Sequence, residues 1–448
     1  MENIKEHNTE LKREISLSEA IMIVIGVVIG SGIFFKASVV FSSAGSTFYG
    51  LMAWVVGGFI TISSALTIAE IAAAIPKTGG VFIYLKELYS ERLAFLYGWM
   101  QTLIYVPAVC AALSIVFVTQ ATYFIELSEM EQKILAIAII IFLATLNTFS
   151  TKAGSKLNFV FTIAKLVPII IIITFGLMNG TNPASITGDE SVVSPFAVAG
   201  FGAAILGTLW AYDGWVSVGN IAGELKNPQR DLPRAIIIGL SVIIAVYLLI
   251  NVAIVKVMPI ADVISSEKAA SDAAVVLFGN SGASLVAAGI MISIFGALNG
   301  YLLTGVRIPY AMAKENLFPY ASTFSKLSKF GTPLNIFIFE VILSILYVLS
   351  GSFNTLTDLV VFVVWIFFVF IVAGIFILRK KFAHLPKPYK VPLYPFFPIV
   401  GILGGIYILG STLVTSTQNA VIGILITLTG LPVYAIIKKN QNANSRAN

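Results

Sequence analysis

The sequence predicts an all-α polytopic membrane protein with 12 transmembrane helices. Of its 448 residues, 58% are hydrophobic and 11% are charged, whereas soluble domains carry roughly a quarter of charged residues. A hydrocarbon core about 30 Å thick needs ~20 apolar residues per helix, so twelve spans use roughly 240 residues and leave about 200 for loops and tails. The apolar runs are too long for the alternating segments of an outer-membrane barrel. This composition excludes a secreted factor, a nucleic-acid-binding protein and a conventional soluble enzyme.

Apolar runs bounded by polar residues, glycine or proline place the helices. We expect them at residues 16–43, 48–75, 93–124, 133–150, 156–178, 198–222, 234–256, 283–313, 333–351, 356–379, 392–411 and 418–437. The chain then divides into an N-terminal tail, helices 1 to 5, helices 6 to 10, helices 11 and 12, and a C-terminal tail, at residues 1–15, 16–178, 198–379, 392–437 and 438–448.

The distribution of lysine and arginine predicts the orientation in the membrane. With these helix boundaries, 23 of the 28 lie on one side, four lie on the other side, and one is left inside a span. The four are Lys36, Lys133, Lys256 and Lys268, and the one inside a span is Lys165. Because cytoplasmic loops are enriched in Lys and Arg, both termini are expected in the cytoplasm. The protein is expected in the cell (inner) membrane. The N-terminal tail lacks the pattern of a signal peptide.

Two helices are interrupted by glycine in mid-span. Helix 1 contains Gly26, Gly30 and the pair Ser31-Gly32, and helix 6 contains Asp213-Gly214. Unwound backbone in a bilayer is tolerated only where it is buried in protein or lines an aqueous cavity. Close helix packing through small residues is the alternative explanation, and Gly26 and Gly30 have the spacing for it. The two later pairs break that spacing, and therefore favour true interruptions.

The two interruptions predict an inverted repeat. Gly32 and Gly214 are 182 residues apart, and each interruption opens a set of five helices. Paired interruptions in two halves point to the central site of a transporter. Since five is an odd number, the second set enters the membrane from the opposite side. Helices 11 and 12 lie outside this 5+5 symmetry.

The backbone ends at such interruptions select the type of ligand. Free N–H groups at the start of a half-helix bind an anion, and free carbonyls at the end of a half-helix bind a cation. A zwitterionic α-amino acid satisfies both ends, although drugs, nucleobases and ions also suit them.

Motifs along nearly the whole chain resemble the amino acid–polyamine–organocation superfamily, in particular its L-amino-acid transporter branch and the bacterial serine/threonine exchangers in it. They lie at residues 29–34, 70, 75–80, 165–166, 211–215, 223–228 and 232–235. The resemblance implies a leucine-transporter-like fold. It also implies alternating-access exchange of small neutral L-amino acids, namely alanine, serine, threonine, cysteine and glycine, without a cofactor or a metal ion.

The resemblance also implies which residues bind substrate. The carboxylate would meet the backbone of Ser31 and Gly32, and the ammonium would meet carbonyls near Val28, Ile29, Trp210, Ala211 and Asp213. Gly30 and Gly214 would allow the conformational change, and Trp210 would be a bulky aromatic gate. The Asp213 carboxylate is open to two interpretations. It either caps the second half of helix 6 or lies free beside the ammonium, which would favour cationic substrates or proton coupling.

Lys165 is the most unusual charged residue, because a lysine in the centre of a bilayer costs about 2.5 to 3.5 kcal/mol. The resemblance implies that its ammonium replaces the bound cation of sodium-coupled relatives and touches carbonyls near Gly26 to Gly30, which makes transport sodium-independent. The alternative is a side chain that reaches back to the cytoplasmic interface. A proton-coupled symporter also stays open, since Lys165 or Asp213 could titrate when desolvated.

The other polar residues in the spans are less informative. Gln101, Tyr105 and Asn299 either line the cavity or make packing hydrogen bonds. Glu70 and Glu340 are expected to pair with basic residues of the cytoplasmic loops, and Glu70 has an inner gate as its alternative role. The single cysteine, Cys110, is expected to be a packing residue. The loop at 127–133 has no cysteine, whereas human relatives attach a heavy-chain glycoprotein there, so no covalent heavy-chain subunit is expected.

Other function classes fit the sequence less well. An enzyme would need a nucleophile with a base, or a set of metal ligands. The chain has two histidines, one cysteine, and no Gly-x-Ser-x-Gly or His-Glu-x-x-His motif. An amino acid channel or transceptor would share the same helices and stays as a remote alternative.

Overall fold

The computed structural model describes residues 15–75, 80–149, 165–181, 198–216, 225–329, 331–384, 387 and 389–447, and every regular element within these ranges is a helix. Seven helices are long and apolar enough to cross a membrane, judged by length and composition. Four shorter apolar helices accompany them, at Leu17–Gly26, Leu166–Asn179, Val198–Tyr212 and Leu334–Ser350. These helices confirm the predicted class, an all-helical polytopic membrane protein.

In the first half of the chain, the predicted helix 1 is divided into three pieces. They are α1 (Leu17–Val28), α2 (Gly32–Phe35) and α3 (Ala37–Ala44). The following elements are α4 (Thr47–Ala74), α5 (Gly80–Leu88), α6 (Glu91–Met100), the π-helix η1 (Gln101–Tyr105), α7 (Val106–Ala121), α8 (Glu129–Phe149) and α10 (Leu166–Asn179). The beginning of the predicted helix 5, residues 156–164, lies outside the described residues.

In the second half, the predicted helix 6 ends at its interruption. Its first part is α12 (Val198–Tyr212), and residues 217–224 lie outside the described residues. The following elements are α13 (Pro228–Val257), α14 (Ile260–Ser265), α15 (Ala269–Gly305), α16 (Arg307–Lys314), α17 (Ala321–Phe324), α18 (Leu334–Ser350), α19 (Phe353–Lys381), α20 (Phe396–Thr415), α21 (Thr417–Leu428) and α22 (Gly430–Ala447). Helix α15 is kinked at Gly279, where φ is +66°.

The helix boundaries follow from local sequence. Ser16 and Glu19 form a capping box that starts α1, because each side chain bonds a backbone N–H that has no partner inside the helix. Ser352 and Thr355 form the equivalent box at the start of α19. Helix α3 ends at Gly45, whose φ of 78° favours glycine.

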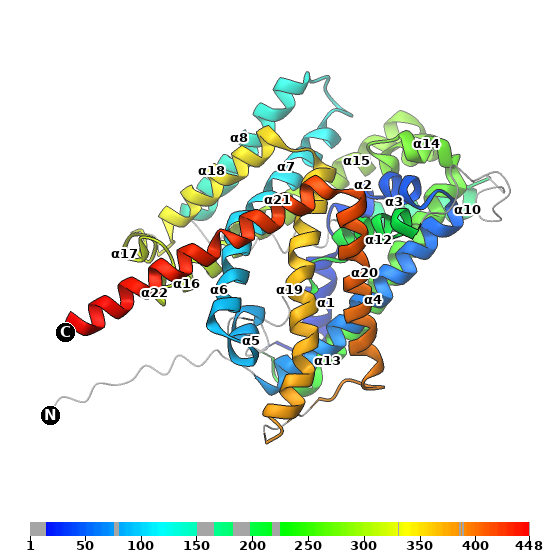
Figure 1. The fold of residues 1–448 in the computed structure, drawn as a ribbon. Coiled ribbons are helices and arrows are strands. Elements are labelled where there is room, and N and C mark those ends of the chain that lie inside the picture. Colours follow the sequence, from blue (N-terminus) through cyan, green and yellow to red (C-terminus); the bar gives the residue numbers. More distant parts are fainter. Residues whose placement is uncertain are drawn as a thin grey trace.

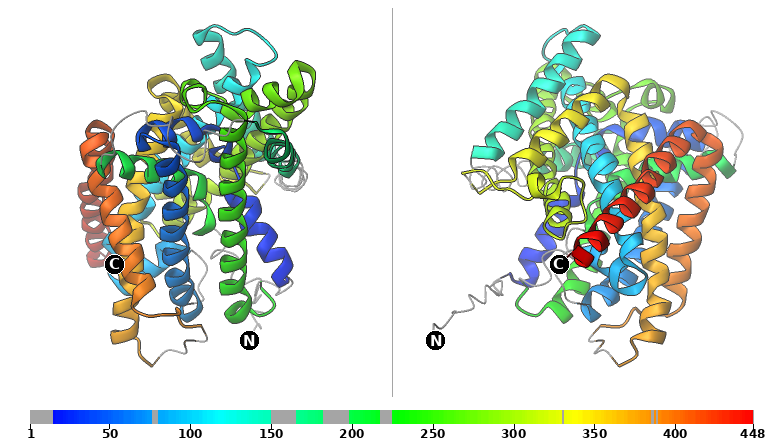
Figure 2. Two further views of the ribbon diagram at one scale, coloured as in Figure 1. Left: turned by 90° about the vertical axis from the view of Figure 1, so that its right-hand side faces the viewer. Right: turned by 60° about the vertical axis from the view of Figure 1, so that its left-hand side comes forward.

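The long helices form one bundle with two distinct ends (Figure 1). One end carries α5, the start of α1 and the end of α19, and the other carries α3 and α14; we call them the α5 end and the α3 end (Figures 1 and 2). The basic last turn of α19, Arg379, Lys380 and Lys381, therefore lies at the α5 end. Helices α1 and α12 both stop inside the bundle, so their interruptions lie between its two ends.

Candidate functional site

The two helix interruptions touch each other. Break 1 comprises residues 29–31, between α1 and α2, and break 2 begins at Asp213 and Gly214, after α12. A Cβ atom added to Gly32 would lie 2.5 Å from the Cα of Ala211 and 2.7 Å from its Cβ. Gly32 therefore allows the backbones of the two breaks to approach. A Cβ on Gly30 would meet only the Val28 carbonyl oxygen, at 3.8 Å, so no crowding requires glycine there.

Backbone geometry explains a second glycine. Gly214 has a φ of +99°, a conformation that residues with a Cβ rarely adopt. The turn after α12 thus needs glycine at this position. The predicted interruption at Ser31-Gly32 is confirmed, and helix 6 ends where its interruption at Asp213-Gly214 was predicted. The predicted continuation of helix 6 over residues 217–222 lies outside the described residues.

A tyrosine of α13 bridges the two breaks. The Tyr247 hydroxyl lies 3.2 Å from the carbonyl oxygen of Val28 and 2.8 Å from that of Ala211. A phenol has a single proton to donate, so it bonds one carbonyl at a time. The sequence offered no signal for this residue, because Tyr247 lies within the continuous apolar run of α13 and resembles a packing aromatic.

Two further aromatic residues surround this bridge. The Tyr212 hydroxyl donates to the Trp54 carbonyl at 3.0 Å, and the Trp54 ring lies 5.6 Å from the ring of Tyr247 and 6.0 Å from that of Tyr212. Both contacts are edge-to-face, a favourable arrangement for aromatic pairs. Helix α4 therefore supports both the end of α12 and the bridging tyrosine.

The Asp213 carboxylate is held by two phenols. The Tyr105 hydroxyl donates a hydrogen bond to it, and the Tyr301 hydroxyl lies 3.4 Å from the same oxygen. Tyr105 is the last residue of η1 and Tyr301 belongs to α15, so break 2 is tied to two neighbouring helices. The Gly214 N–H also interacts with this carboxylate, and the second half of helix 6, which Asp213 was expected to cap, lies outside the described residues. The carboxylate is therefore not free, and its role as a helix cap stays a prediction.

Trp210 covers the breaks on the side of the α3 end. Its indole N–H donates to the Ser31 hydroxyl at 3.3 Å. Its ring meets the ring of Phe353 edge to face at 6.0 Å, and Phe35 packs on the same phenylalanine, also at 6.0 Å. The three rings and the serine join α2, α12 and α19.

Lys36, which the distribution of charges assigned to the side opposite the cytoplasm, lies inside the bundle. Its side chain is fully buried, and its Nζ lies 3.1 Å from Asn354 Oδ1, 3.5 Å from Asp358 Oδ1 and 5.1 Å from the centre of the Phe353 ring. We call these four residues the Lys36 cluster. A signal was present in the sequence, because apolar residues flank Lys36 on both sides and leave no loop.

Lys165 reaches α1. Its ammonium donates a hydrogen bond to the carbonyl oxygen of Gly26, in the last turn of α1, and the residue is 5% exposed. The side chain is thus directed toward the end of α1 that precedes break 1. It does not extend to the membrane interface.

The remaining predicted polar residues have separate surroundings. Gln101 is buried and begins η1. Asn299 makes a packing contact, since its Oδ1 accepts from Asn147 Nδ2 at 2.9 Å and so links α15 to α8. Glu70 pairs with Arg379 through two hydrogen bonds of 2.9 and 2.7 Å, and it also accepts from the Val391 N–H.

The expected pairing of Glu340 is wrong. Its carboxyl group is buried in α18, and neither oxygen has a hydrogen-bond partner among the described residues. The error arises because the sequence indicates how deep a residue lies in the membrane, but does not indicate which neighbouring helix its side chain faces.

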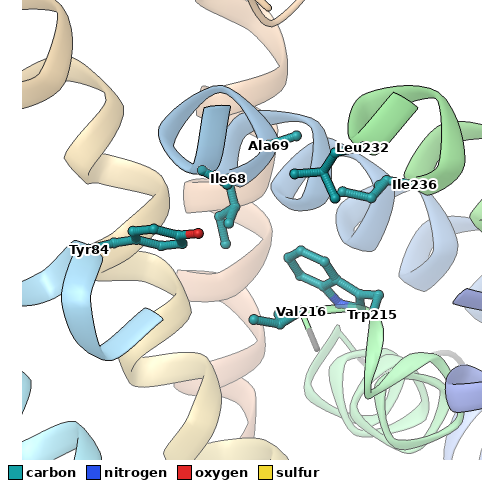
Figure 3. A pocket seen from close by; sticks show the side chains of 8 residues that line it. Ile68, Ala69, Tyr84, Trp215, Val216, Leu232 and Ile236 are labelled. Atoms are coloured by element: carbon teal, nitrogen blue, oxygen red, sulfur yellow. The ribbon is translucent and has the colours of Figure 1, made fainter. Parts of the chain in front are cut away.

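A small cavity adjoins break 2 on the side of the α5 end. Figure 3 shows the indole of Trp215, just after the break, facing side chains of α4, α5 and α13. They are Ile68, Ala69, Tyr84, Leu232 and Ile236. The walls of this cavity are apolar and aromatic.

Similarity to known proteins covers this whole arrangement. The family model described as Amino acid permease matches residues 15–436. The serine/threonine exchanger SteT of Bacillus subtilis is 40% identical over 433 residues, which are 96% of this chain and 98% of that protein. The human b(0,+)-type amino acid transporter 1 is 30% identical (95% of this chain, 88% of that protein), and the human large neutral amino acids transporter small subunit 2 is 31% identical (95% and 80%).

Proposed function

The chain belongs to the amino acid permease family, and on this premise we propose that it is a sodium-independent, obligatory exchanger of small neutral L-amino acids. The proposed substrates are alanine, serine, threonine, cysteine and glycine. The similarity to a serine/threonine exchanger over nearly the full length of both chains supports this choice.

The contact between Lys165 and Gly26 carries the proposal. The ammonium of Lys165 donates a hydrogen bond to a carbonyl at the end of α1. Backbone partial charges at the end of a helix favour a cation. The protein thereby supplies its own cation to the element that must move. Transport consequently needs no sodium ion to hold α1 in place.

The substrate would bind between the two breaks. Its carboxylate would meet backbone N–H groups at Ser31 and Gly32, since the first N–H groups of a helix have no partner within it. Its ammonium would meet the carbonyls of Val28, Ile29, Trp210, Ala211 and Asp213. The Tyr247 hydroxyl uses one lone pair of the Val28 or Ala211 oxygen, and a carbonyl has two. The tyrosine and the ammonium can therefore share these acceptors.

The walls of this site favour small neutral side chains. Trp210 and Phe353 occupy the space toward the α3 end. The Asp213 carboxylate accepts from Tyr105 and lies near Tyr301, so part of its capacity to attract a cationic side chain is already used. A short side chain without charge fits both conditions.

We further propose a topology of 12 spans in a 5+5 inverted repeat, with both termini in the cytoplasm. The α5 end would face the cytoplasm, because it carries the basic last turn of α19. In this orientation the Lys36 cluster closes the outer side of the breaks, and the cavity beside Trp215 marks the inner path. Alternating access would open these two sides in turn.

The protein would work without a covalent heavy-chain subunit. Its one cysteine, Cys110, is fully buried in α7. A disulfide with another chain requires an accessible thiol, which this position does not supply.

Exchange in liposomes tests the proposed function. Purified protein would be reconstituted, and uptake of labelled L-serine and L-alanine measured into vesicles that are empty or loaded with L-serine, with and without sodium and proton gradients. We expect uptake only into loaded vesicles, insensitive to sodium. Uptake into empty vesicles that requires a proton gradient would make the protein a symporter, and a steady conductance without exchange would make it a channel.

Replacing Lys36 by methionine should favour opening of the outer side. The variant keeps the unbranched side chain beside Phe353 and removes the ammonium that joins α3 to Asn354 and Asp358. Accessibility can be measured with Ser31→Cys in a Cys110→Ala background, by the rate of reaction with a membrane-impermeant thiol reagent added outside. We expect reaction at least about threefold faster with Lys36→Met, and a threefold change corresponds to about 0.65 kcal/mol in the stability of the closed state. An unchanged or slower rate would show that the Lys36 cluster does not hold this side closed.

A further inference from the structure

The described residues contain one acidic side chain that is deep in a membrane helix and has no partner. Glu340 lies in the middle of the apolar helix α18 and is 1% exposed. Both of its carboxyl oxygens lack a hydrogen-bond partner among the described residues. In contrast, Glu70, which is equally buried, bonds Arg379 and a backbone N–H.

Glu340 faces α7 across an antiparallel seam. The Tyr347 hydroxyl, two turns further along α18, donates to the Leu103 carbonyl at 3.1 Å. Cys110 of α7 follows Leu103 by two helical turns, and it lies close enough to Glu340 for an electrostatic interaction. The seam therefore pairs Glu340 with Cys110, and Tyr347 with Leu103.

No cation faces Glu340 from the elements packed against α18. Helix α8 carries no titratable side chain from residue 134 to its end, and α17 carries none. The titratable groups on the facing elements are Cys110 of α7, Tyr105 of η1 and Tyr310 of α16, with Tyr347 on α18 itself, and Tyr105 already donates to Asp213. All of these thiol and phenol groups are uncharged at neutral pH in their ordinary protonation states. The two cations of α16, Arg307 and Lys314, have exposed side chains.

An ionised carboxylate in these surroundings would be very costly, because burying an unpaired charge costs far more than burying a neutral polar group. We propose that Glu340 is a proton-binding site within the membrane, protonated in the conformation described here, and that loss of this proton as the pH rises disfavours this conformation and slows amino acid exchange. The inference rests on the proposed transport function and adds a regulatory ligand, the proton, to it.

The seam connects this site to the helix breaks. The π-helix η1 contains both Leu103, which accepts from Tyr347 of α18, and Tyr105, which donates to Asp213 at break 2. π-Helical turns inside α-helices are frequent at functional sites. Ionisation of Glu340 requires water or a cation to enter the seam, which separates α18 from α7 and displaces η1. The position of Tyr105 at break 2 then changes with it.

The pH dependence of exchange tests the inference. L-serine exchange between loaded liposomes would be measured at symmetrical pH from about 5 to 9 for the wild type, Glu340→Gln and Glu340→Asp. Loss of one proton from the described conformation allows a fall of up to about tenfold per pH unit. We expect the wild-type exchange rate to fall at least about threefold as the pH rises. Glu340→Asp should show the same fall, which we call the pH step. Glu340→Gln should exchange at a rate independent of pH.

Two controls separate the outcomes. Cys110→Ser removes the thiol opposite Glu340 and should keep the pH step, which assigns the step to the carboxyl group. An identical step in the wild type and Glu340→Gln would overturn the inference, as would a flat wild-type profile. Absence of exchange at every pH in the wild type would instead contradict the proposed function.

Infrared spectroscopy gives a readout that does not depend on transport. At neutral pH the wild type should show the carbonyl stretching band of a protonated carboxylic acid, and Glu340→Gln should lose it. If the glutamine variant does not fold, Glu340→Leu provides an apolar replacement for the same difference spectrum. A band that persists unchanged in the folded variant would overturn the assignment of a bound proton to Glu340.

Discussion

Substrate binding should be lost when Gly32 is replaced by alanine. The added Cβ would lie 2.5 Å from the Cα of Ala211 and 2.7 Å from its Cβ, closer than non-bonded carbon atoms approach. The neighbouring atoms belong to the backbone and the first side-chain carbon, so a side-chain rotation cannot relieve the clash. Overpacking typically costs about 1 to 3 kcal/mol, or roughly 5- to 150-fold in an equilibrium constant. We expect at least about a tenfold loss of L-serine affinity, and a larger one for Gly32→Val.

Gly30→Ala is the matched control for this prediction. It makes the same change two residues earlier in break 1, where the added Cβ would meet only one atom, at 3.8 Å. Affinity can be measured by binding of labelled L-serine to purified protein, with thermal stability followed in parallel to detect misfolding. We expect near wild-type affinity for Gly30→Ala. Equal affinities for the two variants would mean that the approach of the breaks does not shape the site.

The positions of the two breaks were predictable from the sequence because the cause is local. Backbone that leaves the helix in a membrane needs residues that tolerate unusual conformations and close approach. The sequence shows this directly, as glycine paired with serine or aspartate in mid-span. Gly214 with its positive φ and Gly32 against Ala211 are the physical forms of that requirement.

The contacts that join distant segments were not predictable. Lys36 and Asn354 are 318 residues apart, and Tyr247 lies 219 residues from Val28. A single sequence gives the depth of each residue in the membrane, but the neighbour that it faces depends on the packing of helices. For this reason Lys36 was assigned to the side opposite the cytoplasm, Glu340 was expected to pair with a basic residue, and Tyr247 was overlooked.

The π-helix is a third type of omission. Residues Gln101–Tyr105 contain no glycine or proline, but Pro107 follows two residues later. A proline has no N–H for the carbonyl four residues before it, here that of Leu103, which accepts from Tyr347 instead. The sequence therefore held a signal for an irregular turn that was not used. The wider turn changes which face of α7 the following residues occupy, and its last residue, Tyr105, reaches Asp213. From its polarity alone, Tyr105 was expected either to line the cavity or to make a packing hydrogen bond.

Replacing Lys165 by alanine should lower the rate of exchange at least about tenfold. The Gly26 carbonyl, in the last turn of α1, would lose the ammonium that donates to it. A buried acceptor left without a partner costs about 1 to 3 kcal/mol, or roughly 5- to 150-fold. This cost would apply to the conformation in which the end of α1 lies against Lys165, the residue before α10, and so would upset the balance of conformations that exchange requires. Lys165→Met, which keeps the unbranched stem, should show most of the same loss and thereby separate charge from volume.

Lys256→Ala is the control with the same chemistry at another place. The Lys256 ammonium also donates to a backbone carbonyl, that of Leu177 in α10, at 2.9 Å, but this contact involves neither break. Initial rates of L-serine exchange, normalised to the amount of reconstituted protein, should be near wild type for Lys256→Ala and strongly reduced for both Lys165 variants, with sodium present or absent. If both lysines gave the same small loss, the ammonium of Lys165 would be one packing contact among others. A dependence on sodium that appeared only in Lys165→Ala would instead support the proposal, because a sodium ion would then replace the missing ammonium beside break 1.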